Sequence, residues 1–494
     1  MKKRKTIPLF LLLITIVGIQ LGYSSHLTLN PPTKKSVTTT APSITATGNL
    51  IYCPLSQTKI VSTVTISHDP SDLTTESIYI QIASGYVIGE DQLLLSNATV
   101  HPTITTYWNA LEGKLKLSSP TTGIQVNYSD FEEAIRDVVY YNSNPSPSGT
   151  RNFSISLGNG QANYLPRNGH YYEYVPNLGI TWTNAKAAAA LKTFYGLQGY
   201  LATLTAADEA QLAGKQAPGT GWIGGTDEDT EGVWKWVTGP EAGTIFWNGS
   251  VSGSTPNFAF WNTNEPNNLG EEHYAHVTAP GVGQPGSWND LTLAGASSGA
   301  YQPKGYIVEY GGMPGDPVLQ ISTTSTITIP QITATTNATR CGSGSVTLQA
   351  TANLGTVNWY TTATGGIPVF SGNSFTTPVL SASTNYYVDA LALGCTAGNR
   401  IMVTATINAL PVTQFITPTT ICQNTSTTLT ASTNAGIINW YDSATSTTPL
   451  ATGTTFTTPN LSATTLYYFE ALNNNCVSTR TPITVQVSAA HSVQ

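Results

Sequence analysis

Residues 221–225 read Gly-Trp-Ile-Gly-Gly, and the segments around them decide the fold of the middle of the chain. Upstream, residues 171–175 alternate like a strand, and residues 182–190 carry apolar side chains at the spacing of one helix face. Downstream come Trp234-Lys235-Trp236, Phe260-Trp261, Glu265-Pro266-Asn267, Trp288-Asn289-Asp290 and Tyr306-Ile307-Val308-Glu309. Short strands combined with helices predict an α+β domain over residues 168–312.

Two loops of this domain are rich in side-chain oxygen. Glu265 and Asn267 flank Pro266, and the acid-amide pair of residues 289–290 directly follows Trp288. Calcium takes six to eight oxygen ligands from carboxylates, amide carbonyls and water. A cis Glu265–Pro266 bond, which proline makes accessible, would let both flanking side chains point at one ion. Trp288 would hold the second loop in the core.

The order of these motifs resembles that of C-type lectin-like domains. The resemblance implies a sugar-binding calcium site formed by five residues: Glu265, Asn267, Glu272, Asn289 and Asp290. In the family, two neighbouring hydroxyls of a sugar complete the coordination of the ion. The Glu-Pro-Asn order is similar to that of members preferring mannose-, glucose- or fucose-type hydroxyl pairs. Calcium is therefore the expected cofactor, and a carbohydrate or a surface glycoprotein the expected partner.

The acidic segment 226–232 implies a second, auxiliary calcium site. By the resemblance, Asp227 and Glu231 would be its ligands and Glu272 would be shared. Asn268 and His273 replace further acids of the family, and the loss of two charges would weaken binding. An acidic turn without an ion is the alternative.

The histidines offer little support for a transition metal. His273 and His276 lie three residues apart, but no third nitrogen or sulfur ligand accompanies them in the sequence. We expect His276 to be a strand residue and His273 a rim residue.

The middle domain contains no cysteine. Ala189, Tyr274 and Val308 occupy positions at which the family usually has disulfide cysteines. The domain must make up the stability of those bridges by packing, and its abundant tryptophans are the expected source: Trp182, Trp222, Trp234, Trp236, Trp247, Trp261 and Trp288.

An internal repeat occupies the C-terminal part of the chain. Cys341, Trp359 and Cys395 recur as Cys422, Trp440 and Cys476, each 81 residues later. An early cysteine, a core tryptophan and a late cysteine predict a β-sandwich with one inter-sheet bridge, so we expect the disulfides Cys341–Cys395 and Cys422–Cys476, with Cys53 alone. The two units, 328–410 and 411–490, resemble the immunoglobulin-like modules of exported Bacteroidetes proteins.

The first folded unit is expected over residues 46–164. Residues 78–82 and 114–117 alternate like strands, and residues 131–138 predict one short helix. Several of its phrases, including Tyr140-Tyr141-Asn142, resemble a cadherin-like repeat. Glu90 and Asp91 are expected either to hold calcium or to form a solvated turn.

The N-terminus has the pattern of an export signal. Four basic residues (2–5) precede an apolar stretch and small residues, which predicts a signal peptide over 1–24 and a linker over 25–45, with no membrane span after cleavage. A net charge of −7 argues against nucleic-acid binding. Only 10% of residues are charged, whereas Thr, Ser and Asn are abundant, as in extracellular β-domains. We expect a secreted or outer-surface bacterial protein.

These features together predict a multidomain, mainly β adhesin with calcium-dependent carbohydrate recognition. No nucleophile elbow, phosphate loop or zinc-helix motif indicates an enzyme. One alternative is a non-catalytic scaffold whose lectin-like domain binds protein without sugar or calcium. A more remote one is an exported accessory of glycan hydrolysis.

Overall fold

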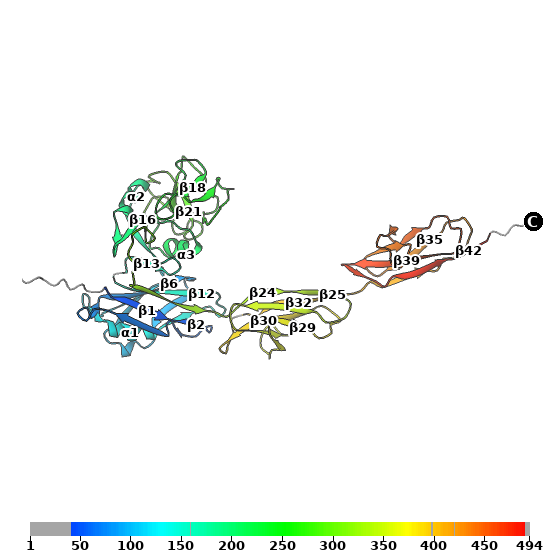
Figure 1. Ribbon diagram of the computed structural model, residues 1–494, viewed down its shortest axis with the longest axis horizontal. Helices are drawn as coiled ribbons and strands as arrows, with labels where there is room; N and C mark the ends of the chain where they lie inside the picture. The colour runs from blue at the N-terminus through cyan, green and yellow to red at the C-terminus, as the bar shows by residue number, and fades with distance from the viewer. Residues whose placement is uncertain (1–40, 159, 397–398, 419, 490–494) are drawn as a thin grey trace, which may run out of the picture. The chain divides into compact units, whose positions relative to one another are not determined.

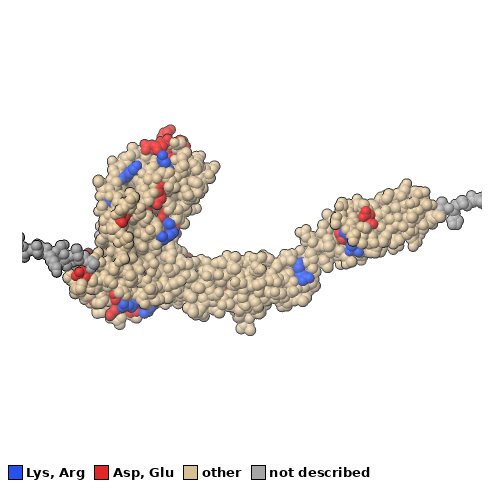
Figure 2. Space-filling view, viewed as in Figure 1, with Lys and Arg blue, Asp and Glu red and all other residues tan. Residues whose placement is uncertain are grey.

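The computed structural model describes residues 41–158, 160–396, 399–418 and 420–489. They form a multidomain, mainly β protein, as predicted (Figure 1). The expected signal peptide and most of the linker lie outside the described residues. No helix in the part of the chain that the structure describes is long and apolar enough to cross a membrane. Figure 2 shows how sparse charged side chains are on the displayed face.

The first domain is built on a six-stranded sheet. Its strand order is β2 (Asn49–Ile51), β23 (Ser322–Thr328), β12 (Thr150–Leu157), β6 (Ser77–Ser84), β9 (Lys114–Ser118), β8 (Thr105–Asn109). The smaller pairings join β1 (Ser43–Thr47) to β4 (Thr63–Ser67), β5 (Thr74–Thr75) to β10 (Val126–Asn127), and β11 (Val138–Asn142) to both β3 (Thr58–Lys59) and β7 (Asp91–Leu95). The helices are α1 (Tyr128–Asp137) and the 3-10 helix η1 (Ala98–Val100). The predicted helix and both predicted strands are thus confirmed, although α1 begins earlier than expected.

This domain is discontinuous in sequence. Strand β23 follows the middle domain along the chain, yet it pairs antiparallel with β12 and parallel with β2. Its Ile327 is fully buried in the core of the first domain. The expected range 46–164 lacks this strand because β23 consists almost entirely of Ser and Thr, which give no apolar pattern. The middle domain is therefore an insertion between β12 and β23.

Asp91 fits neither of its two expected roles. Its side chain is buried, and its carboxylate accepts hydrogen bonds from Arg151 Nε at 2.7 Å and Tyr140 Oη at 2.6 Å. A buried carboxylate needs such a partner to offset its lost hydration. Asp91 is a structural ion-pair residue, and the cadherin-like relationship of the domain stays a prediction.

The middle domain has one main sheet around β22. The order is β13 (Asn163–Leu165), β14 (His170–Pro176), β22 (Gly305–Tyr310), β17 (Trp222–Thr226), β18 (Val233–Trp236), β19 (Ile245–Asn248). Attached to it are β15 (Thr193–Phe194), β16 (Leu197–Leu201), β20 (Tyr274–Val277) and β21 (Trp288–Leu291). The helices are α2 (Trp182–Ala190), α3 (Ala207–Glu209) and the π-helix η2 (Ala210–Lys215). Because β14 pairs with β22, the two ends of the domain lie side by side.

Small residues let the central strand approach its neighbours. A Cβ on Gly221 would lie 2.4 Å from the carbonyl oxygen of Gly305, and one on Gly224 would lie 2.1 Å from Thr238 Oγ1. Glycine is therefore required at both positions. Trp222 and Ile223, between them, are fully buried.

Packing replaces the missing disulfides, as expected. Ala189, Tyr274 and Val308 are all buried in one hydrophobic cluster. Five of the tryptophans named above are also buried, namely Trp182, Trp222, Trp234, Trp236 and Trp288, and Trp247 and Trp261 are partly buried.

Two β-sandwich modules complete the described chain. The first module has two sheets. One has the strand order β24 (Ile332–Thr336), β26 (Thr347–Ala352), β29 (Ser374–Thr376). The other has the order β25 (Ala338–Cys341), β32 (Ile401–Asn408), β30 (Thr384–Ala392), β27 (Thr356–Tyr360), β28 (Phe370–Ser371), and β31 (Cys395–Thr396) pairs with β30. The second module has three sheets. The first has the strand order β33 (Thr413–Ile416), β35 (Thr428–Thr433), β38 (Thr455–Thr457), and the smallest pairs β34 (Ile421–Cys422) with β42 (Val487–Ser488). The largest has the order β37 (Ala451–Thr452), β36 (Ile437–Tyr441), β39 (Thr465–Asn473), β40 (Cys476–Val477), and β41 (Thr481–Val485) also pairs with β39. Trp359 and Trp440 are fully buried, as the repeat predicted.

The disulfides differ from the predicted ones. Cys53 is bonded to Cys395 and Cys341 to Cys476, and Cys422 is the free cysteine among the described residues. The expected pairs Cys341–Cys395 and Cys422–Cys476 are therefore wrong, as is the expectation that Cys53 is alone. The bonds link successive parts of the chain instead of the two sheets of one module.

Strand register explains why the expected bridge cannot form. Cys341 lies opposite Asn408, beyond the end of β30 at which Thr384 pairs with β32. Cys395 pairs with Ala392 at the other end of β30. Nine residues of β30 lie between these ends, a span of about 26 Å, whereas disulfide-bonded Cα atoms lie within about 7 Å.

Candidate calcium and ligand site

The site is built on strand β21 and on the long loop before β20. The backbone N–H of Asn262 donates to Trp288 O at 2.7 Å, and that of His273 donates to Leu291 O at 3.1 Å. Both ends of the loop are thus tied to the two ends of β21. Trp288 is fully buried among aromatic rings, with its ring centroid 5.6 Å from that of Trp236, so it holds β21 in the core as expected.

The structure brings all five predicted side chains to the wall of one cavity of about 330 Å³. These residues are Glu265, Asn267, Glu272, Asn289 and Asp290. Leu269 and Tyr301 also line the cavity and are exposed beside it. The sequence reasoning missed both. Tyr301 could have been noticed as the one aromatic residue in the Gly- and Ser-rich segment after Asp290.

Asp290 organises the loop as well as lining the cavity. Its carboxylate accepts the backbone N–H of Asn267 at 3.2 Å and of Asn268 at 2.8 Å. The Glu265–Pro266 bond is cis, the condition under which the flanking side chains were expected to converge, and the Asn267 amide donates to the carboxylate of Glu265. The two flanking side chains therefore lie together on the side of the cavity.

Burial and mutual repulsion raise the pKa of two carboxyl groups in the cavity. Burial, followed by the charges of Asp290 and Glu272, raises the pKa of Glu265 to about 8. Burial, followed by the charge of Asp290, raises the pKa of Glu272 to about 7. Three carboxylates crowded in this way favour the binding of a cation, because a cation relieves their repulsion.

The buried side chain of Asn289 offers a further test of whether the cavity suits a calcium ion. It is 1% exposed, and its Oδ1 atom is buried without a hydrogen-bond donor, while its Nδ2 donates to the backbone oxygen of Asp290. An unsatisfied buried acceptor is costly. Oxygen from two amides and three carboxylates is the donor set that calcium prefers, so the residues present fit this ion.

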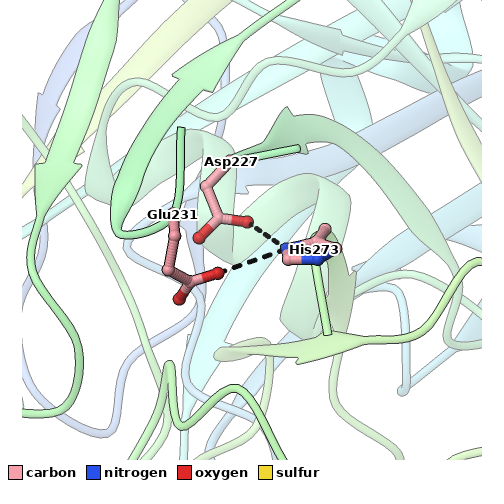
Figure 3. A group of neighbouring side chains, drawn as sticks. All are labelled: Asp227, Glu231 and His273. Atoms are coloured by element: carbon pink, nitrogen blue, oxygen red, sulfur yellow. Dashed lines mark hydrogen bonds and ion pairs between the residues drawn. The ribbon is translucent and has the colours of Figure 1, made fainter. Parts of the chain in front are cut away.

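The expected auxiliary site has a different composition. His273 Nδ1 lies 3.1 Å from Asp227 Oδ1 and 3.5 Å from Glu231 Oε2 (Figure 3). These three side chains form one compact group. Glu272, which was expected to be shared, lines the cavity described above. The group is therefore a carboxylate–imidazole cluster, in which His273 lies where the resemblance placed the replacement of an acid.

His276 is a buried strand residue, as predicted. It lies on β20 opposite Asn289 and is fully buried. Burial lowers its pKa to about 3, so the imidazole is neutral at physiological pH.

The chain is of an extracellular type with several immunoglobulin-like modules, and small parts of it are similar to lectins. The family described as "Ig-like domain CHU_C associated" matches residues 328–408 and 409–488, in agreement with the predicted modules. Such modules and the disulfides fit an extracellular or surface protein.

Particular relatives are similar over parts of the chain. Halomucin of Haloquadratum walsbyi is 33% identical over 286 residues, which are 56% of this chain and 3% of halomucin. The hepatic lectin of Gallus gallus is 39% identical over 71 residues, 14% of this chain and 26% of the lectin. The CD209 antigen of Symphalangus syndactylus is 35% identical over 81 residues, 16% of each chain. This chain therefore spans at most about a quarter of the length of each of these proteins.

Solved structures that match include the fibronectin(III)-like modules of Clostridium thermocellum CbhA, with 12% identity and a TM-score of 0.22, covering 33% of this chain and 97% of that chain. The tandem Ig repeats of Dlar match with 13% identity and a TM-score of 0.15, covering 33% of this chain and 98% of that chain.

Proposed function

We propose that the protein is a non-enzymatic surface adhesin whose middle domain binds carbohydrate through a calcium ion. The observation that carries the proposal is the cavity wall, which gathers five oxygen-bearing side chains, two of them carboxyl groups with a raised pKa. The ligands of the ion would be Glu265, Asn267, Glu272, Asn289 and Asp290. The similarity to the hepatic lectin and to the CD209 antigen supports the same assignment.

The ion and the acids together are suited to a pair of neighbouring hydroxyls. Five side chains leave coordination positions open on an ion that takes six to eight oxygens. Each sugar hydroxyl that fills such a position also donates to a carboxylate or accepts from an amide N–H. The Glu-Pro-Asn order favours mannose-, glucose- or fucose-type hydroxyl pairs.

The rim of the cavity is suited to the apolar face of a sugar ring. Tyr301 is 44% exposed and Leu269 is 78% exposed, and both line the cavity beside the acids. A sugar presents C–H groups on one face and hydroxyls at its edge. One edge can thus meet the ion while a face rests on the phenol ring.

The immunoglobulin-like modules would serve as spacers for display. Their described residues show compact apolar cores around Trp359 and Trp440. A site open to solvent binds one sugar weakly, and many copies on a surface supply avidity.

A glycan array probed with and without a chelator tests the proposal. Glu265→Gln removes a carboxylate that would bind the ion and is expected to abolish calcium-dependent retention. Asp229→Asn is the control, because the Asp229 side chain is 73% exposed and does not line the cavity. Retention by the wild type that survives EDTA would instead support the scaffold alternative. Cleavage of the glycan would support a role in hydrolysis.

A further inference from the structure

We propose that Asp227, Glu231 and His273 form a binding site for a nitrogen-preferring divalent ion, such as Zn²⁺, in place of an auxiliary calcium site. The cluster lies between the end of β17, the acidic turn after it and the residue before β20 (Figure 3). It is separate from the five-residue cavity, so this proposal does not depend on the proposed carbohydrate function.

The spacing of the donor atoms suits a small tetrahedral ion. His273 Nδ1 lies 3.1 Å from Asp227 Oδ1 and 3.5 Å from Glu231 Oε2. Zinc binds nitrogen and carboxylate oxygen at about 2.0–2.1 Å, which places neighbouring ligands of a tetrahedron about 3.3 Å apart. The two observed separations bracket that value, and all three donor atoms lie within 4.8 Å of one another.

Asp227 is held in position for such a role. The residue is 1% exposed, and its Oδ2 accepts the backbone N–H of Gly232 at 2.9 Å. Its other carboxylate oxygen, Oδ1, is directed at the imidazole of His273. A buried carboxylate that is oriented by the backbone on one side presents the other oxygen with little loss of conformational freedom on binding.

The other nitrogen of the imidazole also has a suitable neighbour. Glu271 Oε2 lies 3.6 Å from His273 Nε2. A histidine that binds a metal through one nitrogen commonly directs its other N–H to a carboxylate, which selects the tautomer and increases the basicity of the ligand. Glu271 is in position to do so for a metal bound at Nδ1.

The donor chemistry disfavours calcium at this point. Calcium is a hard ion that takes six to eight oxygens, whereas imidazole suits zinc, copper, iron and nickel. The cluster offers two carboxylates and one imidazole, three ligands that would leave one position of a tetrahedral zinc ion for water. Replacement of an oxygen ligand by His273 thus changes which ion the site prefers.

The test uses the full chain carrying Glu265→Gln, which removes a carboxylate of the neighbouring cavity but keeps the hydrogen bonds that Asp290 accepts from the loop. Titration with Zn²⁺ by calorimetry and with Co²⁺ by visible absorption is expected to show one ion per chain, unaffected by excess calcium. His273→Asn is expected to lower the Zn²⁺ affinity at least ~100-fold. Asp229→Asn is the control, because Asp229 belongs to the same acidic turn but is exposed and paired with Lys235.

His273→Asp provides a test that does not depend on loss of binding. It restores an all-oxygen set and is expected to exchange the preference, with weaker Zn²⁺ binding and stronger calcium binding. Absence of Zn²⁺ and Co²⁺ binding in the Glu265→Gln chain would overturn the proposal and leave His273 as a counter-ion of the acids. Binding that survives His273→Asn unchanged would overturn it as well.

Discussion

Asp290 accepts the backbone N–H of Asn267 through its Oδ1 atom at 3.2 Å, although the two residues lie 23 positions apart in the sequence. The same carboxylate lines the cavity and raises the pKa of two neighbouring glutamates. One side chain therefore shapes the loop and sets the charge of the site, so the two functions cannot be changed independently at this position.

Asp290→Asn should reduce calcium affinity by at least tenfold, which corresponds to about 1.4 kcal/mol. The amide keeps the size of the side chain but removes a charge and offers one acceptor where the carboxylate offers two. Calorimetric titration of the full chain measures the effect, and Asp229→Asn is the matched control. An affinity equal to that of the wild type would remove Asp290 from the ligand set.

Calcium binding should strengthen as the pH rises from about 6 to about 9. In the ion-free protein the pKa of Glu272 is about 7 and that of Glu265 about 8, so both acids still carry protons near neutral pH. Calcium must displace these protons, and its affinity is lower wherever they are bound. Titrations in buffers of different ionisation enthalpy should show protons released on binding.

The raised pKa values of Glu265 and Glu272 also predict how the stability of the calcium-free protein changes with pH. The folded protein binds protons on these acids at pH values where the unfolded chain has already lost them, so the free energy of unfolding should fall as the pH rises from about 5 to about 8. Glu265→Gln should flatten this dependence. Stability that increased with pH over the same range would contradict the raised pKa values.

Trp288→Ala should lower the free energy of unfolding of the middle domain by about 3–5 kcal/mol, as is typical for a buried aromatic residue. Its ring centroid lies 5.8 Å from that of Phe246 and 5.9 Å from that of Trp261. Denaturant unfolding followed by tryptophan fluorescence measures the loss. Trp247→Ala, at a partly buried position, should cost less; equal costs would argue against a core role for Trp288.

One thiol should react with an alkylating reagent in the oxidised, native protein, and peptide mapping should place it at Cys422. Cys422→Ser should abolish this reaction, whereas Cys53→Ser should expose a second thiol at Cys395. A tryptic peptide that joined Cys341 to Cys395 would restore the pairing expected from the repeat.

Local sequence was sufficient for the candidate site. The Glu265–Pro266 bond, the buried Trp288 and the cavity wall all depend on short motifs whose side chains act within one or two loops. The resemblance placed His273 beside Asp227 and Glu231 only as the replacement of an acid, and the contact between its imidazole and Asp227, 46 residues away in the sequence, is a property of the fold.

Long-range pairing was the part that the sequence could not supply. Strand β23 joins the first domain through backbone hydrogen bonds. Its run of Ser and Thr residues has no apolar pattern from which this pairing could be predicted. The cysteines recur with the repeat and so suggested bonds within each unit. Their strand register, which places them at opposite ends of β30, is a property of the assembled sheet.

The insertion of the middle domain between β12 and β23 determines how the chain responds to tension. A pull on the segment beyond Ile329 enters the first domain through β23, where seven register pairs with β12 and three with β2 resist it in shear. A pull on a ligand bound at the cavity would instead pass through the middle domain and reach the first domain by both β12 and β23, because the two ends of the middle domain connect to these neighbouring strands.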